Sequence, residues 1–144
     1  MDEKDAKNLF LAWLVGSVVL FFAPFFAPGY VVLGNDRVSP FLAPFISSLL
    51  IVILVKLLMM VVSKYMKLNK ASETSMGILL LLGYVLSLWL VARAALYVGF
   101  GIASFWVAIG IGVILATAEY WFSRISSYKV SAVKKQVKKS KRRR

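Results

Sequence analysis

The sequence contains no cysteine and no histidine among its 144 residues. The lack of cysteine excludes disulfide bonds and thiolate chemistry. Without either residue type, haem attachment through cysteine and the common zinc sites cannot form. The side chain that most often shuttles protons near pH 7, histidine, is also missing. The composition therefore predicts neither a metal site nor a cofactor.

Acidic residues are also scarce, with 6 Asp or Glu against 18 Lys or Arg and a net charge of +12. The sequence has no glycine-rich phosphate loop, no paired carboxylates and no nucleophile placed beside a base. We therefore expect a protein that is not an enzyme.

Apolar residues are abundant, because 60% of the chain is hydrophobic and the mean hydropathy is +0.80. A soluble domain is usually about 45–50% apolar. Four segments reach the roughly 20 apolar residues that a membrane-spanning helix needs. They cover about residues 9–33, 41–62, 76–98 and 102–122. This pattern predicts an all-α integral membrane protein, with a four-helix transmembrane domain over 1–128 and a basic tail over 129–144.

Short connections and the placement of basic residues predict the topology. Short links make neighbouring helices antiparallel, so we expect two antiparallel hairpins. Basic residues before the first span, in the link over 63–75 and in the tail would lie on one side, whereas Arg37 alone lies on the other. The side rich in Lys and Arg is normally cytoplasmic. Both termini are therefore predicted to be cytoplasmic, in the plasma or inner membrane if the source is prokaryotic.

The first span contains two prolines, Pro24 and Pro28. Each removes a backbone donor and crowds the preceding helical turn. One interpretation is a kink or an end near Pro24, with an aromatic segment lying at the outer interface. The other, which is preferred, is a simple helix stop before a loop.

The two predicted hairpins resemble each other. Ser39–Ala43 opens the second span and Ser104–Ala108 opens the fourth, in matching positions. Each follows a glycine-containing turn, Gly29–Val32 in one case and Gly99–Ile102 in the other. This suggests a parallel duplication of the kind found in some transporters. Chance is the competing explanation, because apolar stretches align easily.

The same segments carry a resemblance to a family. Pro28–Val32, Ser39–Ala43 and the run Gly101–Trp106 before an apolar helix look like the small four-helix membrane proteins of phage holin family 4. The resemblance covers about residues 20–122 and implies a four-helix membrane fold. That family has no settled biochemical activity, so the resemblance implies little about mechanism.

Charged residues inside predicted spans are candidates for function, because intramembrane charge is costly. Lys56 precedes Lys64 by eight residues, roughly 12 Å along a helix, and Glu119 precedes Arg124 by five, roughly 7.5 Å. Three interpretations remain open for Lys56 and Glu119: snorkelling to the headgroups, a structural ion pair, or a transport site. Arg93 is closer to the opposite surface, where it could snorkel, pair with Asp36 or, less readily, line an ion pathway.

Small residues repeat along the third and fourth spans and predict close helix packing. The candidates are Gly83, Ser87, Ala94, Ala108, Gly112 and Ala116. The packing could join helices within one chain or neighbouring protomers in a homo-oligomer. The second span lacks such a stripe, so its bulky surface over 49–62 is expected to face lipid.

The tail is the most basic part of the chain. The residues predicted to contact anionic lipid or another polyanion are Lys134, Lys135, Lys138, Lys139, Lys141, Arg142, Arg143 and Arg144. Each such charge contributes about 1 kcal/mol near an anionic bilayer surface. Nucleic acid or the ribosome is the alternative partner, although no aromatic residue follows Tyr128 to stack on bases.

These observations lead to three hypotheses of function. The first is a small polytopic membrane protein with a structural or accessory role, which associates through small-residue helix faces in an oligomer or a larger complex. The second is a holin-like oligomer that permeabilises membranes. The third is a small transporter or channel that uses Lys56 and Glu119.

Overall fold

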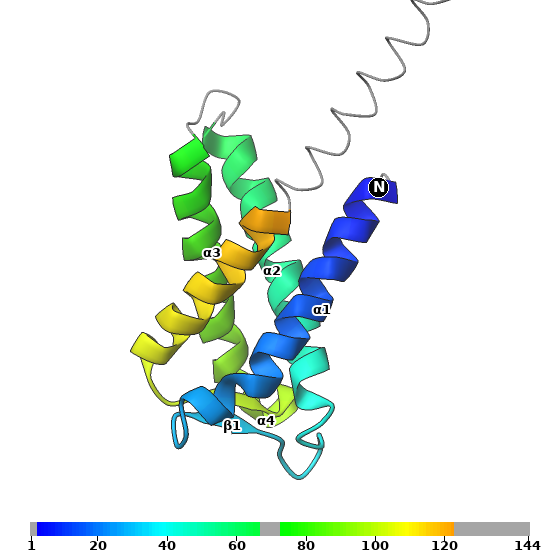
Figure 1. Cartoon of the computed structure of the whole chain (residues 1–144), viewed down its shortest axis with the longest axis vertical. Coiled ribbons are helices and arrows are strands. Elements are labelled where there is room, and N and C mark those ends of the chain that lie inside the picture. The colour runs from blue at the N-terminus through cyan, green and yellow to red at the C-terminus, as the bar shows by residue number, and fades with distance from the viewer. Residues whose placement is uncertain (1–2, 67–72, 123–144) are drawn as a thin grey trace, which may run out of the picture.

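The computed structural model describes residues 3–66 and 73–122, and predictions for the link over 67–72 and the tail over 129–144 lie outside this part (Figure 1). The long helices are α1 (Glu3–Phe26), α2 (Ala43–Met66), α3 (Glu73–Arg93) and a last helix over Phe105–Phe122, called here the C-terminal helix. A short helix α4 (Ala95–Val98) follows α3, and two strands, β1 (Val31–Leu33) and β2 (Phe100–Ile102), complete the order.

Four helices of the described chain are long and apolar enough to cross a membrane, as the sequence predicts. The first predicted span is wrong at its end, since α1 stops at Phe26 and not near residue 33. The helix continues through Pro24 and ends two residues later. Beyond it the chain turns at Gly29, whose φ of 80° is a conformation that glycine adopts readily. Hydropathy could not mark this end, because the apolar residues continue into β1.

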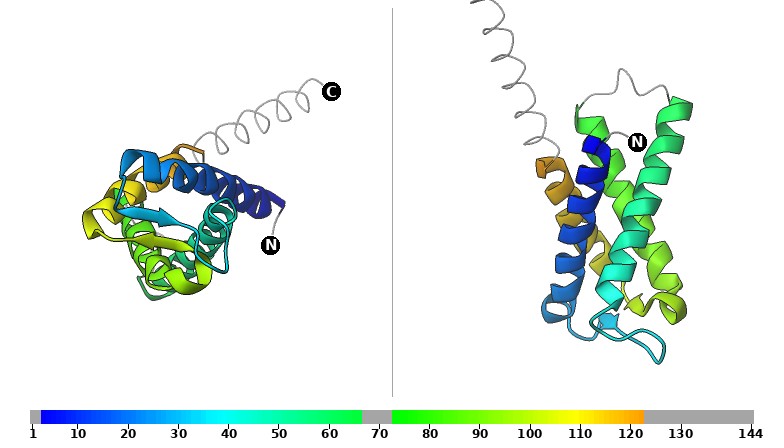
Figure 2. Two further views of the ribbon diagram at one scale, coloured as in Figure 1. Left: turned by 90° about the horizontal axis from the view of Figure 1, so that it is seen from below. Right: turned by 90° about the vertical axis from the view of Figure 1, so that its right-hand side faces the viewer.

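The two strands are absent from the all-α prediction. They pair antiparallel, with Val31 opposite Ile102 and Leu33 opposite Phe100. The ladder joins the link after α1 to the link before the C-terminal helix, at the bottom of Figure 1 and in the foreground of the left view of Figure 2. We call this end of the molecule the cap end, formed by residues 27–42 and 94–104. The sequence predicted no pairing of these segments, and the duplication of the two hairpins stays a prediction.

The Asn35 side chain joins the turn after β1 to helix α4 at the cap end. Its side-chain Nδ2 donates to the backbone oxygens of Ala95 (2.9 Å) and Leu96 (2.8 Å), across 60 residues of sequence. Its Oδ1 accepts from the backbone nitrogens of Arg37 (2.9 Å) and Val38 (2.7 Å). One side chain therefore shapes its own turn and fastens that turn to α4.

Helix α2 packs against both α1 and α3, and the C-terminal helix completes the bundle (Figures 1 and 2). The expectation that the surface of α2 over 49–62 faces lipid is wrong for one side of the helix. Ile51, Val52 and Val55 are at most 2% exposed, whereas Leu49, Ile53 and Leu57 are exposed. The physical reason is that α2 is apolar on all sides, so hydrophobicity does not distinguish its buried face.

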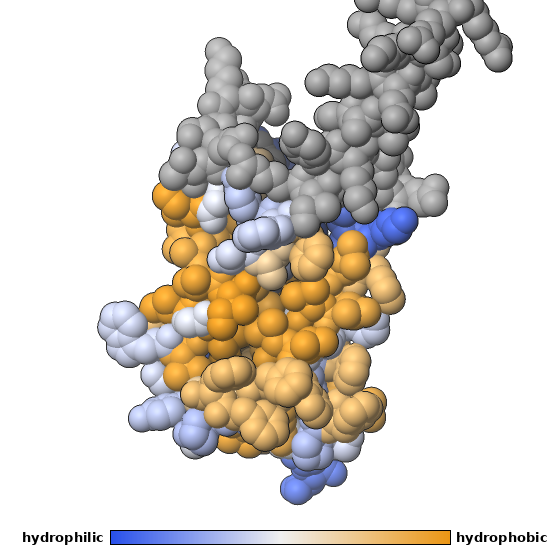
Figure 3. Space-filling view, viewed as in Figure 1, coloured by the Kyte–Doolittle hydropathy of each residue, from blue (hydrophilic) through white to orange (hydrophobic). Residues whose placement is uncertain are grey.

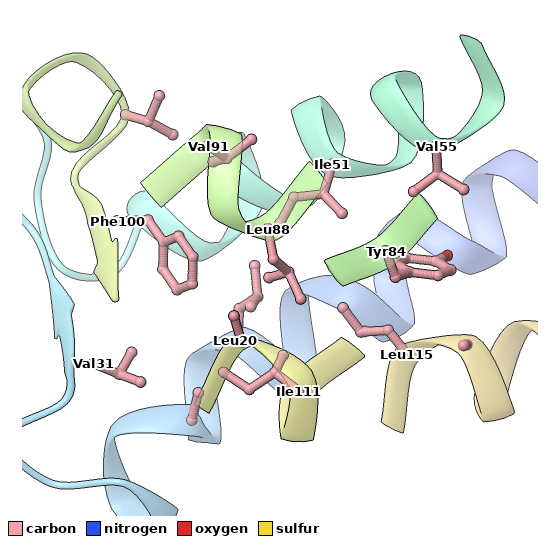
Figure 4. Close-up of a cluster of buried hydrophobic side chains, with 14 residues drawn as sticks. Leu20, Val31, Ile51, Val55, Tyr84, Leu88, Val91, Phe100, Ile111 and Leu115 are labelled. Carbon is pink, nitrogen blue, oxygen red and sulfur yellow. The ribbon is translucent and has the colours of Figure 1, made fainter. Parts of the chain in front are cut away.

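The core extends along the whole bundle (Figure 4). Phe100 of β2 and Val31 of β1 close it at the cap end, and Val55, Tyr84 and Leu115 lie toward the other end. Outside this core the helices expose many large apolar side chains, and Figure 3 shows them as a band between more hydrophilic ends. Such a band suits contact with lipid, where exposed apolar area carries no penalty.

Candidate functional site

Polar side chains from three helices meet inside the bundle, toward the end opposite the cap. Lys56 comes from α2, Tyr84 from α3 and Glu119 from the C-terminal helix. The Nζ atom of Lys56 lies 2.6 Å from Oε1 of Glu119, and the hydroxyl of Tyr84 donates to Oε2. We call these three residues the clamp, because they join three helices that are distant in sequence.

The clamp compensates the negative charge of the Glu119 carboxylate, which is mostly removed from water. The Glu119 side chain is 15% exposed, whereas that of Lys56 is 43% exposed. Removing an ion from water costs several kcal/mol, and the cost is offset only when the partner and the hydrogen bonds are well placed. Here each carboxylate oxygen has its own donor. The structure thus brings together two of the three charged residues that the sequence places inside the spans.

Tyr84 was not among the predicted site residues. A signal for it existed, since Tyr84 lies eleven residues after Glu73, where α3 begins, and so falls away from the interfacial aromatic belts. A buried tyrosine hydroxyl normally needs a hydrogen-bond partner. A tyrosine in the middle of a span therefore indicates a polar group on a neighbouring helix.

A small cavity of about 80 Å³ opens beside the clamp. A water molecule occupies about 30 Å³ in the liquid, so there is room for a few waters or one small polar group. Lys56, Tyr84 and Glu119 form its polar wall together with Asn8 of α1, and its remaining lining is apolar, formed by Leu11, Ala12, Val15, Leu115 and Phe122. Leu11 and Phe122 are 37% and 42% exposed, so the cavity reaches the surface between α1 and the C-terminal helix.

A second polar contact joins α1 to α2. The backbone oxygen of Trp13 accepts hydrogen bonds from the hydroxyls of Ser17 and Ser48, each at 2.8 Å. A Cβ atom on Gly16 would lie 2.3 Å from Oγ of Ser48, so only glycine permits this approach. This contact was not predicted, because the predicted stripes of small residues lie on the third and fourth spans.

The predicted small residues divide between different neighbours. A Cβ atom on Gly112 would lie 2.7 Å from Cγ2 of Val85, so the C-terminal helix packs closely on α3 there. Gly83 instead faces Val55 of α2, at 3.8 Å from its would-be Cβ. The remaining four are Ser87, Ala108 and Ala116, all at most 7% exposed, and Ala94, which packs against the core.

Two grooves flank the C-terminal helix. The first, between it and α3, has a volume of about 400 Å³ and contains Gly77, Ala116 and Thr117. We call it the α3 groove. The second, between it and α1, has a volume of about 600 Å³ and an apolar lining that includes Ala23, Gly110 and Ile111. We call it the α1 groove. Cβ atoms on Gly77 and Gly110 would meet nothing within 4 Å, so both glycines expose bare backbone.

Arg93 lies at the cap end of α3. Its guanidinium carbon is 4.9 Å from the centre of the Trp89 ring, which also packs edge-on against Phe105. A cation over an aromatic face is stabilised by the ring quadrupole. Among the residues that the structure describes, Arg93 does not pair with Asp36.

Four apolar helices of spanning length, packed around a shared core, define a multi-pass membrane protein. Comparison with protein-family models, with curated proteins and with solved structures finds no match.

Proposed function

We propose that this chain is a structural or accessory membrane protein, which spans the bilayer four times as two antiparallel hairpins. The observation that carries the proposal is the clamp. Lys56 and Glu119 compensate each other and take a further hydrogen bond from Tyr84, so these charges join helices. A side chain that transports an ion has to release one partner and bind another. Lys56, Glu119 and Tyr84 instead bind one another and join three helices, which favours a structural role.

The proposed orientation places the cap end outside and both termini in the cytoplasm. Lys7 and Lys64 lie at the end opposite the cap, and Arg37 lies in the cap. This distribution follows the excess of Lys and Arg that cytoplasmic loops carry. The basic tail over 129–144, with its nine Lys or Arg residues, would then lie on the anionic cytoplasmic leaflet.

The α3 groove is the proposed surface for association with a helix of a neighbouring protein or of a second copy. In lipid, small residues allow helix backbones to approach closely, and close packing is a main source of helix association there. Gly77 exposes its backbone in this groove and Ala116 lines its wall. Of the predicted small residues, Gly112 is already used within the chain, so association through that position is not proposed.

Single cysteines test this face, because the natural sequence has none. Ile78 lines the α3 groove and Ile114 lines the α1 groove, and both are 54% exposed, so they form a matched pair. Each cysteine variant would carry a thiol-linked photo-cross-linker in native membranes. We expect Ile78→Cys to give a discrete cross-linked protein product and Ile114→Cys to give none. Equal products from both positions, or none from either, would refute association through the α3 groove.

A holin-like oligomer is the second candidate, in keeping with the family resemblance. The observation that favours it is the presence of grooves on two sides of the C-terminal helix, which would allow one chain to contact two neighbours. This function predicts a ladder of cross-linked self-products from both cysteine positions, together with loss of membrane potential on expression. A single product with an intact potential supports the accessory role instead.

A further inference from the structure

The clamp cavity and the α1 groove follow one another along the same two helices, α1 and the C-terminal helix. On α1 the cavity is lined by residues between Asn8 and Val15, and the groove by residues between Val18 and Phe26, with Ala27 just beyond the helix. On the C-terminal helix the cavity residues begin at Leu115, and the groove residues run from Val107 to Ile114. We call this continuous surface the seam. It is polar at one end and wholly apolar over the rest of its length.

The polar end of the seam can bind an anion. The Lys56 ammonium has three N–H donors, and within the described residues one of them is directed to Glu119. Its side chain is 43% exposed, so the other donors can reach a ligand in the cavity. The Asn8 amide supplies a further donor in the lining of the cavity. The Glu119 carboxylate already accepts from Lys56 and Tyr84, which reduces its repulsion of an incoming anion.

The apolar end has the length and the shape of a hydrocarbon chain site. Ala23 and Ile111 form its floor at 5% and 7% exposure, while Val18, Phe22 and Ile114 form an exposed rim. From Glu119 to Val107 the helix rises about 18 Å, at about 1.5 Å per residue. One leaflet of the hydrocarbon core is about 15 Å thick, half of the whole. The seam from Glu119 to the far end of the groove is therefore somewhat longer than one leaflet, and the groove occupies the part toward the cap end, so an acyl chain that starts at the clamp reaches the groove and follows most of it.

We propose that the seam binds one anionic phospholipid, with its phosphate on Lys56 and Asn8 and one acyl chain in the α1 groove. A partner helix would match the apolar groove but would leave the remaining donors of Lys56 and the Asn8 amide without a ligand. An amphiphile matches both parts. The site is separate from the tail and does not depend on the accessory role, because it uses the other side of the C-terminal helix.

Native mass spectrometry of the full chain in detergent tests the site, with phosphatidylglycerol and phosphatidylcholine as the two probes. We expect one phosphatidylglycerol to be retained in preference to phosphatidylcholine. Gly110→Leu fills the groove where a Cβ meets nothing within 4 Å, and should weaken that retention about tenfold, or about 1.4 kcal/mol. Gly77→Leu makes the same change in the α3 groove and should leave lipid retention unchanged.

All variants keep the tail, so its general attraction for anionic lipid cancels from the comparison. Equal retention by Gly110→Leu and the natural chain, equal loss in both glycine variants, or equal retention of both lipids would overturn the proposal. Should Gly110→Leu lose helical content, Val18→Trp fills the same groove from its exposed rim, with Ile78→Trp as its control. In the cross-linking test Gly77→Leu should reduce the product, so the lipid site and the association face can fail separately.

Discussion

The two ends of the molecule are held together by different means. At the cap end, a two-stranded ladder and the Asn35 side chain join links that are about 60 to 70 residues apart, using mostly backbone groups. At the other end, the clamp joins three helices through side chains alone. The hydrogen bonds of the cap end are numerous and join neutral groups, whereas the clamp depends on two opposite charges that compensate each other. The two ends should therefore respond differently to single substitutions.

The largest effect is expected at the clamp. Lys56→Met leaves the Glu119 carboxylate without its cation and should lower the free energy of unfolding by about 3 kcal/mol, because breaking a buried pair strands the remaining charge. Glu119→Gln strands Lys56 and should cost less, since that side chain is more exposed. The double variant should lose clearly less than the sum of the two. Unfolding in mixed detergent micelles measures all three.

Strictly additive losses at the clamp would mean that Lys56 and Glu119 act independently, as two snorkelling residues would. That result would also weaken the proposed accessory role, because the compensation of the two charges is its main support.

A smaller effect is expected at the cap. Asn35→Ala removes hydrogen bonds to four backbone groups, and a typical net contribution is about 0.5–1.5 kcal/mol per bond. Because Asn35 is only partly buried and water can replace some of these bonds, we expect a loss of about 1–2 kcal/mol. The matched control is Asp36→Ala at the exposed neighbouring position, which should change the free energy of unfolding by less than about 0.5 kcal/mol. Equal losses for the two variants would show that Asn35 does not fasten the turn to α4.

The contrast between the ends also explains what the sequence could predict. Lys56 and Glu119 are rare residue types in apolar spans, and counting residues from the basic flanks places them at similar depth. An ion pair between them was therefore one of the alternatives predicted from the sequence. The existence of four apolar helices follows directly from length and hydropathy, and the structure contains them.

The cap could not be predicted in the same way. Val31–Leu33 is an apolar segment that hydropathy assigns to the first span, whereas Phe100–Ile102 falls in the short link before the fourth span and at its first residue. Their pairing depends on backbone groups, which every residue carries. The buried face of α2 was missed for a related reason, because Ile51 and Leu49 are equally apolar and only tertiary packing distinguishes them.

The orientation of the two ends is the central claim, since the proposed four-span topology and the placement of the tail on the cytoplasmic leaflet both depend on it. Asp36→Cys and Lys64→Cys place single thiols at exposed positions, one at the cap end and one at the opposite end. A membrane-impermeant maleimide applied to intact cells should label Asp36→Cys, and should label Lys64→Cys only after permeabilisation. Labelling of both thiols in intact cells, of neither, or of Lys64→Cys alone would contradict the account.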